Sequence, residues 1–239
     1  MSSLVLVRHA QASFFADDYD RLSEVGRTQA VLLGQHWIRI GLAFDEVYTG
    51  PRRRQQQTAE LVGIVYAEAG TRWPEPVVVP EFDEFDLGGL LHALAPERAR
   101  QDSAFAELMA RYHESADDPS RARNFQKAFE ALTRHWVAAG HLLTGLETWP
   151  AFRARVQQGM HRLLERPGRG RRVAVFTSGG FIGTVVQLAL NGPDRLALEM
   201  SWRIRNCALT EFVFTRDRLT LDGFNAVPHL EKPELWTYR

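Results

Sequence analysis

The sequence contains a single cysteine, Cys207, so no disulfide can form within the chain. Long apolar runs are missing too, because no stretch reaches the roughly 20 residues that a membrane-spanning helix needs. The opening segment, MSSLVLVRHA, has a short apolar run but no basic residue before it, which argues against a secretory signal peptide. From these absences we expect a soluble, cytoplasmic protein with no membrane partner.

A surplus of charge is also absent, because 29 basic residues balance 29 acidic ones. Nucleic-acid-binding domains usually carry a basic surplus, so we expect no nucleic-acid partner. The 239 residues are 45% hydrophobic and 24% charged, which is the composition of an ordinary globular protein. That composition excludes a disordered chain or a fibrous repeat, and the length allows a sizeable core.

Short apolar runs that predict strands alternate with amphipathic runs that predict helices over much of the chain. Strands are expected at residues 4–7, 44–48, 77–79, 173–177, 208–215 and 219–224. Helices are expected at residues 23–40, 52–70, 148–163 and 181–190. This alternation predicts a single α/β domain over residues 1–239, with a mixed, mostly parallel sheet and helices on both faces.

The stretch from residue 84 to 145 interrupts this alternation, because it contains no convincing strand. Two helical patterns, at residues 96–114 and 121–139, fill most of it. We expect the part from about residue 88 to 145 to be a helical cap inserted over the carboxyl ends of the strands. Substrate choice would then depend on this cap.

Side chains that suit an anion follow three of the expected strands. Arg8 and His9 end the first strand, three arginines ending at Arg54 follow the second, and a Ser-Gly-Gly turn that begins at Ser178 follows the strand at 173–177. Ligands of open α/β sheets bind outside the carboxyl ends of the strands. Arginine forks and a glycine turn that opens a helix suit a phosphate group. A histidine beside them could attack phosphorus as a nucleophile.

An acidic cluster follows the strand expected at 77–79 and contains Glu81, Asp83, Glu84 and Asp86. One of these carboxyl groups could supply the proton that a leaving alkoxide needs. Composition and spacing alone do not decide which of them acts.

Five segments resemble, in order, the motifs of the histidine phosphatase superfamily, which includes the phosphoglycerate mutases. LVLVRHAQAS resembles the Arg-His-Gly signature in its Arg-His-Ala form, and DRLSEVGRTQA is similar to the segment after it. YTGPRRRQQQTAE resembles the second-arginine motif, EFDLGG the Glu-x-x-x-Gly motif, and VFTSGGFIG the last motif. ETWPAFRARV looks like the helix before that last motif, and the whole resemblance spans about residues 4–215.

The resemblance implies a phosphatase that hydrolyses a phosphomonoester through a phosphohistidine on His9. Arg8 and Arg54 would clamp the phosphoryl oxygens, and Glu84 would protonate the leaving group, with Glu81 as the nearby alternative. No metal or cofactor is expected, because the arginines supply the positive charge. The expected partner is a small phosphorylated substrate or phosphate. Mutase activity and a homodimer are left open.

Ser178 departs from the family pattern, which places a second catalytic histidine directly before Gly-Gly. With Gly179, it would complete the phosphate-binding site as a neutral hydrogen-bond donor. A serine can donate such a bond but brings no positive charge. Loss of one preorganised donor of this kind costs on the order of a hundred- to a thousandfold in rate.

Two other functions stay open at this point. A protein of the same fold could bind a phosphorylated ligand without catalysis, with Ser178 as the disabling change. A serine hydrolase could instead use Ser178 as its nucleophile, with Asp217 or Asp222 and His229 completing a triad. That second hypothesis leaves the arginines and the first histidine unexplained.

Arg8 and His9 also have a plainer interpretation, as a strand-end pair bonded to a loop carboxylate such as Asp18. The presence of Arg54 and Glu84 in register with the family motifs favours the phosphate site over this structural role.

Overall fold

The computed structural model describes residues 1–13, 20–115, 118–139 and 145–238. The chain divides into two compact units, one made of Met1–Glu84 with Arg155–Arg239 and the other of Phe85–Ala154. Asp18 lies outside the described residues, so the structural role that depends on it stays a prediction. Across the described ranges, no helix has both the length and the apolar character that crossing a bilayer requires.

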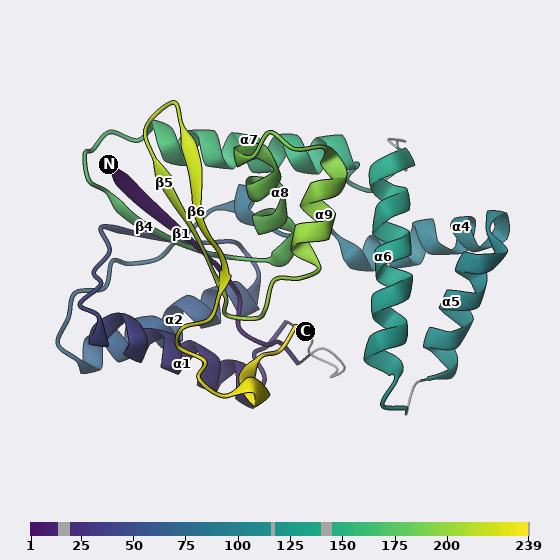
Figure 1. The fold of residues 1–239 in the computed structure, drawn as a ribbon, viewed down its shortest axis with the longest axis horizontal. Coiled ribbons are helices and arrows are strands. Elements are labelled where there is room, and N and C mark those ends of the chain that lie inside the picture. The colour runs from purple at the N-terminus through teal and green to yellow at the C-terminus, as the bar shows by residue number, and fades with distance from the viewer. Residues whose placement is uncertain (14–19, 116–117, 140–144, 239) are drawn as a thin grey trace. The chain divides into compact units, whose positions relative to one another are not determined.

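The first unit is built on a mixed sheet whose six described strands have the order β3-β2-β4-β1-β5-β6 (Figure 1). The strands are β1 (Ser2–Arg8), β2 (Glu46–Thr49), β3 (Val77–Val78), β4 (Arg172–Thr177), β5 (Leu209–Phe214) and β6 (Leu219–Ala226). β3, β2, β4 and β1 pair in parallel, whereas β5 is antiparallel to both β1 and β6. The α/β class and the mixed, mostly parallel sheet predicted from the sequence are confirmed.

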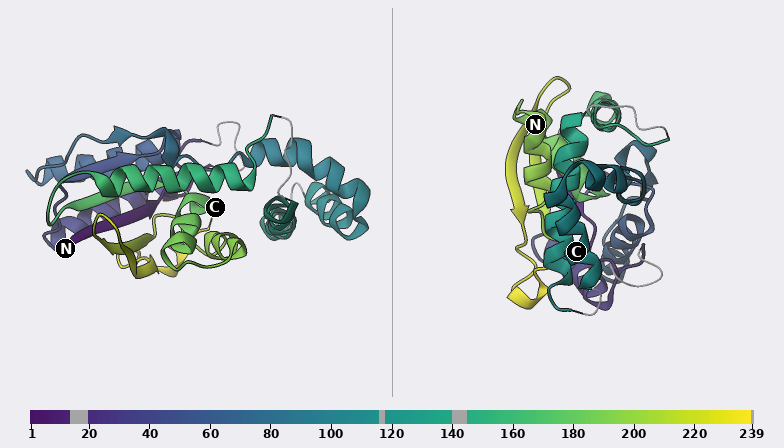
Figure 2. Two further views of the ribbon diagram at one scale, coloured as in Figure 1. Left: turned by 90° about the horizontal axis from the view of Figure 1, so that it is seen from above. Right: turned by 90° about the vertical axis from the view of Figure 1, so that its right-hand side faces the viewer.

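Helices of the first unit cover both faces of this sheet (Figures 1 and 2). They are α1 (Glu24–Arg39), α2 (Arg53–Glu68), the later part of α7 (Trp149–Glu165), α8 (Gly179–Ala189) and α9 (Asp194–Ser201). Apolar residues of α1 and α2, such as Trp37 and Tyr66, pack with Phe176 of β4 in one buried cluster. The sequence pattern does not predict α9, since this short helix buries only Ala197 and Leu198.

The ends of two helices follow from their sequence. The Ser23 hydroxyl accepts a hydrogen bond from the Gly26 N–H (3.0 Å) and caps α1. Gly41, just after α1, has a φ of 67°, a left-handed conformation that glycine adopts without strain. The Thr148 hydroxyl likewise accepts from the Ala151 N–H (3.3 Å) at the start of α7.

Among its described residues, the second unit consists of helices and short turns and contains no strand. Its elements are α3 (Leu87–Gly89), a π-helical turn (Leu90–Leu94), α4 (Ala95–Gln101), α5 (Ser103–Glu114), α6 (Arg121–Ala139) and the start of α7. The prediction of one helix over residues 96–114 is wrong. The chain breaks at Asp102, because its carboxylate accepts from the Phe105 N–H (3.1 Å) and starts a new helix. The function of this unit as a cap stays a prediction.

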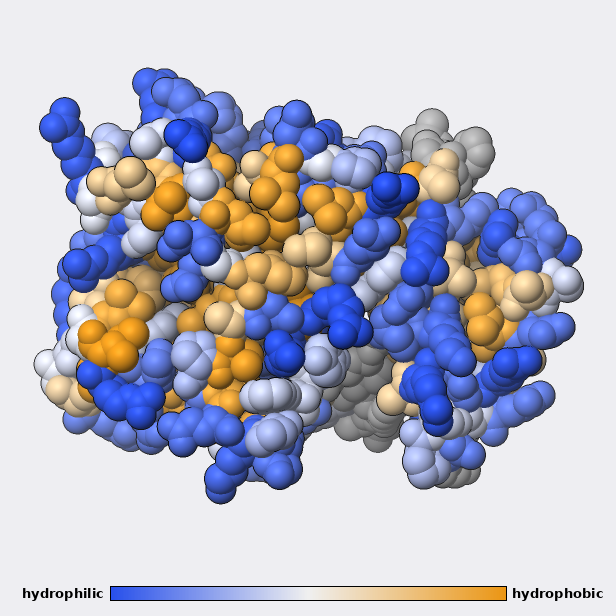
Figure 3. Space-filling model, viewed as in Figure 1, coloured by the Kyte–Doolittle hydropathy of each residue, from blue (hydrophilic) through white to orange (hydrophobic). Residues whose placement is uncertain are grey.

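Strand β6 lies at the edge of the sheet, and most of its residues are half-buried. On the face shown in Figure 3, apolar side chains gather over β5, β6 and the neighbouring helices of the first unit. A homodimer stays a prediction.

His229 is buried in the C-terminal segment, and neither ring nitrogen has a hydrogen-bond partner among the described residues. Burial, with a smaller effect from the nearby His36, lowers the pKa of His229 from its usual 6.5 to about 3. Below pH 6.5 the unfolded chain binds a proton at this position that the folded chain does not bind. Titration of His229 therefore costs no stability above pH 6.5, and below it the free energy of unfolding falls progressively as the pH drops toward 3.

We expect the variant His229→Leu to be at least as stable as the wild type at pH 7, because it removes two buried polar atoms that lack partners. Below pH 6, its stability should exceed that of the wild type by an amount that grows by about 1.4 kcal/mol per pH unit. Urea unfolding of both proteins at a series of pH values measures this difference. A difference in the free energy of unfolding that stays constant with pH would contradict the lowered pKa of His229.

Candidate active site

The carboxyl ends of the parallel strands bring the predicted site residues to one edge of the sheet. His9 follows β1, and its N–H donates to the Thr177 carbonyl at the end of β4 (2.8 Å). Because Arg8 and Thr177 pair in register, His9 and Ser178 come directly after neighbouring strands. Arg54 lies in the first turn of α2, which follows β2.

His9 is buried, with 4% of its surface exposed, and two contacts fix its tautomer. Arg54 Nε donates to His9 Nε2 (3.2 Å), and His9 Nδ1 lies 2.8 Å from the Ala10 carbonyl oxygen. An arginine can only donate, so Nε2 carries the lone pair and Nδ1 carries the proton that it donates to the carbonyl. Burial, with the Arg54 and Arg8 cations, holds the pKa of His9 well below its usual range. The imidazole is therefore neutral, with the lone pair of Nε2 directed toward Arg54.

The backbone around His9 is held by the segment that precedes β5. Cys207 has a φ of 59°, and its N–H donates to the carbonyls of Arg8 (3.1 Å) and His9 (3.2 Å). Asn206 Nδ2 also donates to the His9 carbonyl (3.3 Å), and the Thr237 hydroxyl donates to Asn206 Oδ1 (3.0 Å). Thr237 thus helps to hold the backbone of His9 through Asn206.

Arg54 is almost fully buried and forms an ion pair with Asp20 besides its contact with His9. Arg54 Nη1 lies 2.6 Å from Asp20 Oδ1, and Asp20 Oδ2 accepts from the Arg53 N–H (2.8 Å). These two contacts hold the guanidinium in place beside His9. Sequence reasoning missed this role of Asp20, and its only signal was its place at the start of the DRLSEVGRTQA segment.

Arg8 lies against the start of α8. Its Nη1 donates to the Ile204 carbonyl, and its Nε lies 3.7 Å from where a Cβ on Gly179 would be. The N–H of Gly179 is the first of α8 and has no carbonyl partner within the helix. An arginine and a free helix N–H side by side favour an anion at this position.

Glu84 is bonded to the same helix end, because its Oε2 accepts from the Gly180 N–H (2.9 Å). Arg155 orders the preceding turn by donating to the carbonyls of Glu81 (3.2 Å) and Glu84 (3.5 Å). The Glu81 carboxylate pairs with Arg162 instead. Between the two candidate acids, the geometry favours Glu84.

Ser178 lies between β4 and α8 with 1% of its surface exposed, and its side chain does not cap the helix. Its hydroxyl oxygen accepts from Gln55 Nε2 (2.7 Å). A serine-hydrolase triad needs a histidine on this hydroxyl, but His229 bonds to none of the described residues through its ring nitrogens. This geometry disfavours the serine-hydrolase hypothesis. Gln55 was not a candidate, since only its position next to Arg54 could have singled it out.

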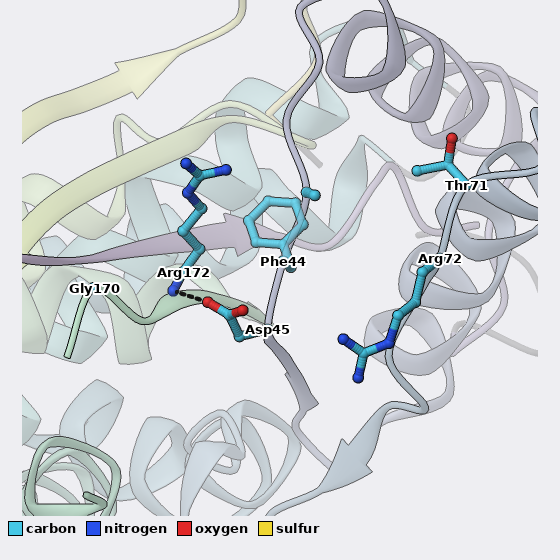
Figure 4. Close-up of a pocket in the computed structure, with 7 residues that line it drawn as sticks. Phe44, Asp45, Thr71, Arg72, Gly170 and Arg172 are labelled. Carbon is cyan, nitrogen blue, oxygen red and sulfur yellow. Dashed lines mark hydrogen bonds between the residues drawn. The ribbon is translucent and has the colours of Figure 1, made fainter. Parts of the chain in front are cut away.

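A hollow of about 350 Å³ lies at the amino ends of the strands, away from the carboxyl ends that carry the predicted site residues (Figure 4). It lies beside Asp45, which precedes β2, and Arg172, which begins β4, so it belongs to the amino ends of the strands. The Arg172 N–H donates to Asp45 Oδ2 (2.7 Å). None of the predicted site residues lines this hollow.

Comparison of the sequence with known proteins identifies its relatives. The sequence profile of the histidine phosphatase superfamily (branch 1) matches residues 4–227. A 2,3-bisphosphoglycerate-dependent phosphoglycerate mutase from Bartonella bacilliformis is 34% identical over 106 residues, which are 42% of this chain and 52% of that protein. The match therefore spans about half the length of that relative.

Solved structures of low sequence identity share the fold. A mycobacterial glucosyl-3-phosphoglycerate phosphatase in complex with inorganic phosphate is 23% identical, with a TM-score of 0.62 over 96% of this chain and 99% of the other. Phosphoserine phosphatase from Entamoeba histolytica, in complex with 3-phosphoglyceric acid, is 17% identical. Its TM-score is 0.63, over 96% of this chain and 100% of the other. With the family match over residues 4–227, the chain belongs to the histidine phosphatase superfamily.

Proposed function

We propose that this chain hydrolyses phosphomonoesters and passes the phosphoryl group through His9. The observation that carries the proposal is the buried, neutral imidazole whose Nε2 lone pair accepts from the Arg54 guanidinium. A neutral histidine is a nucleophile, and an adjacent cation draws a phosphoryl group to it. Phosphatases among the structural neighbours support the reaction class.

The reaction has two steps. First, His9 Nε2 attacks phosphorus, the bond between phosphorus and the ester oxygen breaks, and Glu84 gives its proton to the leaving oxygen, so that an alcohol departs. A water molecule then attacks phosphorus, the phosphorus–nitrogen bond breaks, and Glu84 takes the proton of the water as phosphate leaves. The Nδ1–H of His9 remains bonded to the Ala10 carbonyl in both steps.

The remaining groups stabilise the charge on the phosphoryl oxygens. Arg54 turns its N–H groups from Nε2 to the substrate, and Arg8 and the Gly179 N–H bind the oxygens on the other side. Ser178 adds a neutral donor. These cations do the work that Mg²⁺ does in other phosphoryl-transfer enzymes, so the proposal includes no metal. The helical unit would select the substrate, and a cytoplasmic location remains our expectation.

The variant Ser178→Ala tests the role of the serine. We expect turnover to fall by about a hundredfold, because a donor to the developing charge is lost. Phosphate binding should weaken by about tenfold or less, since a neutral hydrogen bond contributes about 0.5–1.5 kcal/mol net. Steady-state kinetics with an aryl phosphate and calorimetric titration with inorganic phosphate give the two values.

A fluorophosphonate probe separates the competing hypotheses in the same proteins. Covalent labelling of Ser178 would support a serine hydrolase and remove His9 as the nucleophile. If the wild type and the variant bind phosphate but hydrolyse no phosphomonoester, the non-catalytic phosphate-binding function is correct instead.

A further inference from the structure

Gln55 occupies a fully buried position in the first turn of α2, directly after Arg54. Its Nε2 donates to Ser178 Oγ (2.7 Å), and its Oε1 accepts from the Arg52 N–H (3.0 Å). A backbone N–H can only donate, so the contact with Arg52 fixes which end of the amide is the oxygen. The NH₂ group therefore faces Ser178.

Gly50 makes room for this amide at the end of β2. A Cβ on Gly50 would lie 2.2 Å from Gln55 Oε1 and 2.5 Å from the Phe82 carbonyl oxygen. No side chain fits there without displacing the amide or the backbone around Phe82. The turn after β2 thus accommodates Gln55 in one orientation.

The contact with Gln55 decides where the Ser178 hydroxyl can point its proton. Because a lone pair of Oγ accepts from the amide, the hydroxyl proton must turn away from Gln55. This proton meets no acceptor within the described part of the chain, whereas the hydroxyl of neighbouring Thr177 donates to the Phe82 carbonyl (2.7 Å). The second N–H of Gln55 likewise has no acceptor among the described residues. Both donors lie beside the strand end that carries His9.

We propose that Gln55 is a positioning residue that holds the Ser178 hydroxyl with its proton directed at a phosphoryl oxygen. A hydroxyl that accepts a hydrogen bond is polarised and becomes a better donor, and burial strengthens the effect. The inference rests on the proposed function, since it assigns the phosphoryl group as the acceptor. Gln55 acts through Ser178 and does not take part in the chemistry itself.

The test is a double-mutant cycle on binding of inorganic phosphate and on aryl phosphate turnover. Gln55→Met keeps the length of the side chain but removes both N–H donors. We expect it to weaken phosphate binding by about tenfold and to lower kcat. In the Ser178→Ala background, the same substitution should change each value by less than about twofold, because the two residues form one unit. Gln56→Ala, at an exposed neighbour on α2, is the matched control and should leave both values unchanged.

Equal effects of Gln55→Met in both backgrounds, or no effect in either, would overturn the proposal. Binding of inorganic phosphate can be measured without turnover. It therefore decides the role of Gln55 even if His9→Ala shows that the proposed function is wrong. Melting temperatures of all variants report on folding.

If Gln55→Met does not fold, Gln55→Glu replaces it in the test. At pH 7.5 its carboxylate would accept the Ser178 proton, so phosphate should bind at least tenfold more weakly than to the wild type. As the pH falls, the protonated acid can donate again. The difference in phosphate affinity between the variant and the wild type at the same pH should then disappear. Phosphate binding like that of the wild type at pH 7.5 would overturn the proposal.

Discussion

Replacing His9 with alanine is expected to lower turnover of an aryl phosphate by about four orders of magnitude or more. The variant lacks the only group that the proposed mechanism uses to attack phosphorus, and the remaining arginines can merely bind the substrate. Release of 4-nitrophenol from its phosphate ester, measured with a chelator in the buffer, gives the rate. The wild type should be fully active under these conditions.

His161→Ala is the matched control for this experiment, because His161 is exposed on α7 and contacts Glu165 (3.4 Å), remote in sequence from the site. We expect this variant to behave as the wild type. Undiminished activity of His9→Ala would disprove the assignment of the nucleophile. A wild type that loses its activity in the chelator would be a metal enzyme.

Replacing Glu84 with glutamine should have the second-largest effect, about a thousandfold on an alkyl phosphate, because the alkoxide then leaves without a proton. An aryl phosphate with an acidic leaving group should be affected much less, since its phenolate departs without protonation. The ratio of the two rates therefore reports on the acid itself, whereas a loss of folding would lower both rates together.

Glu81→Gln is the control for Glu84, since the Glu81 carboxylate pairs with Arg162 and not with the start of α8. It should leave the ratio of alkyl to aryl rates unchanged. If Glu81→Gln changes this ratio and Glu84→Gln does not, Glu81 is the proton donor.

Much of the fold follows from local sequence patterns. The buried runs of β1 and β4 are set by residues close together in the chain, and their apolar character predicts them. The break at Asp102 was missed, because an apolar pattern that continues across residues 96–114 hides a carboxylate that caps a new helix. The short helix α9 buries too few residues to produce a clear pattern.

The site could be predicted only as far as its motifs reach. His9, Arg54 and Glu84 have recognisable neighbours in the sequence, and the structure puts all three near the ends of β1, β4 and α8. The contacts of Asp20 with Arg54 and of Gln55 with Ser178 join segments 34 and 123 residues apart. Nothing in the local sequence of either residue encodes such a contact, so only the folded chain reveals it.

Mass spectrometry of the enzyme quenched during turnover tests the covalent step on His9 most directly. The sample must be kept alkaline, because a phosphorus–nitrogen bond to imidazole is labile in acid. We expect the mass of a phosphoryl group on the peptide that contains His9, and none on that peptide from His9→Ala. A phosphoryl group on Ser178, or an unmodified His9 peptide in an enzyme that forms 4-nitrophenol in a burst without a matching burst of inorganic phosphate, would contradict the phosphohistidine mechanism.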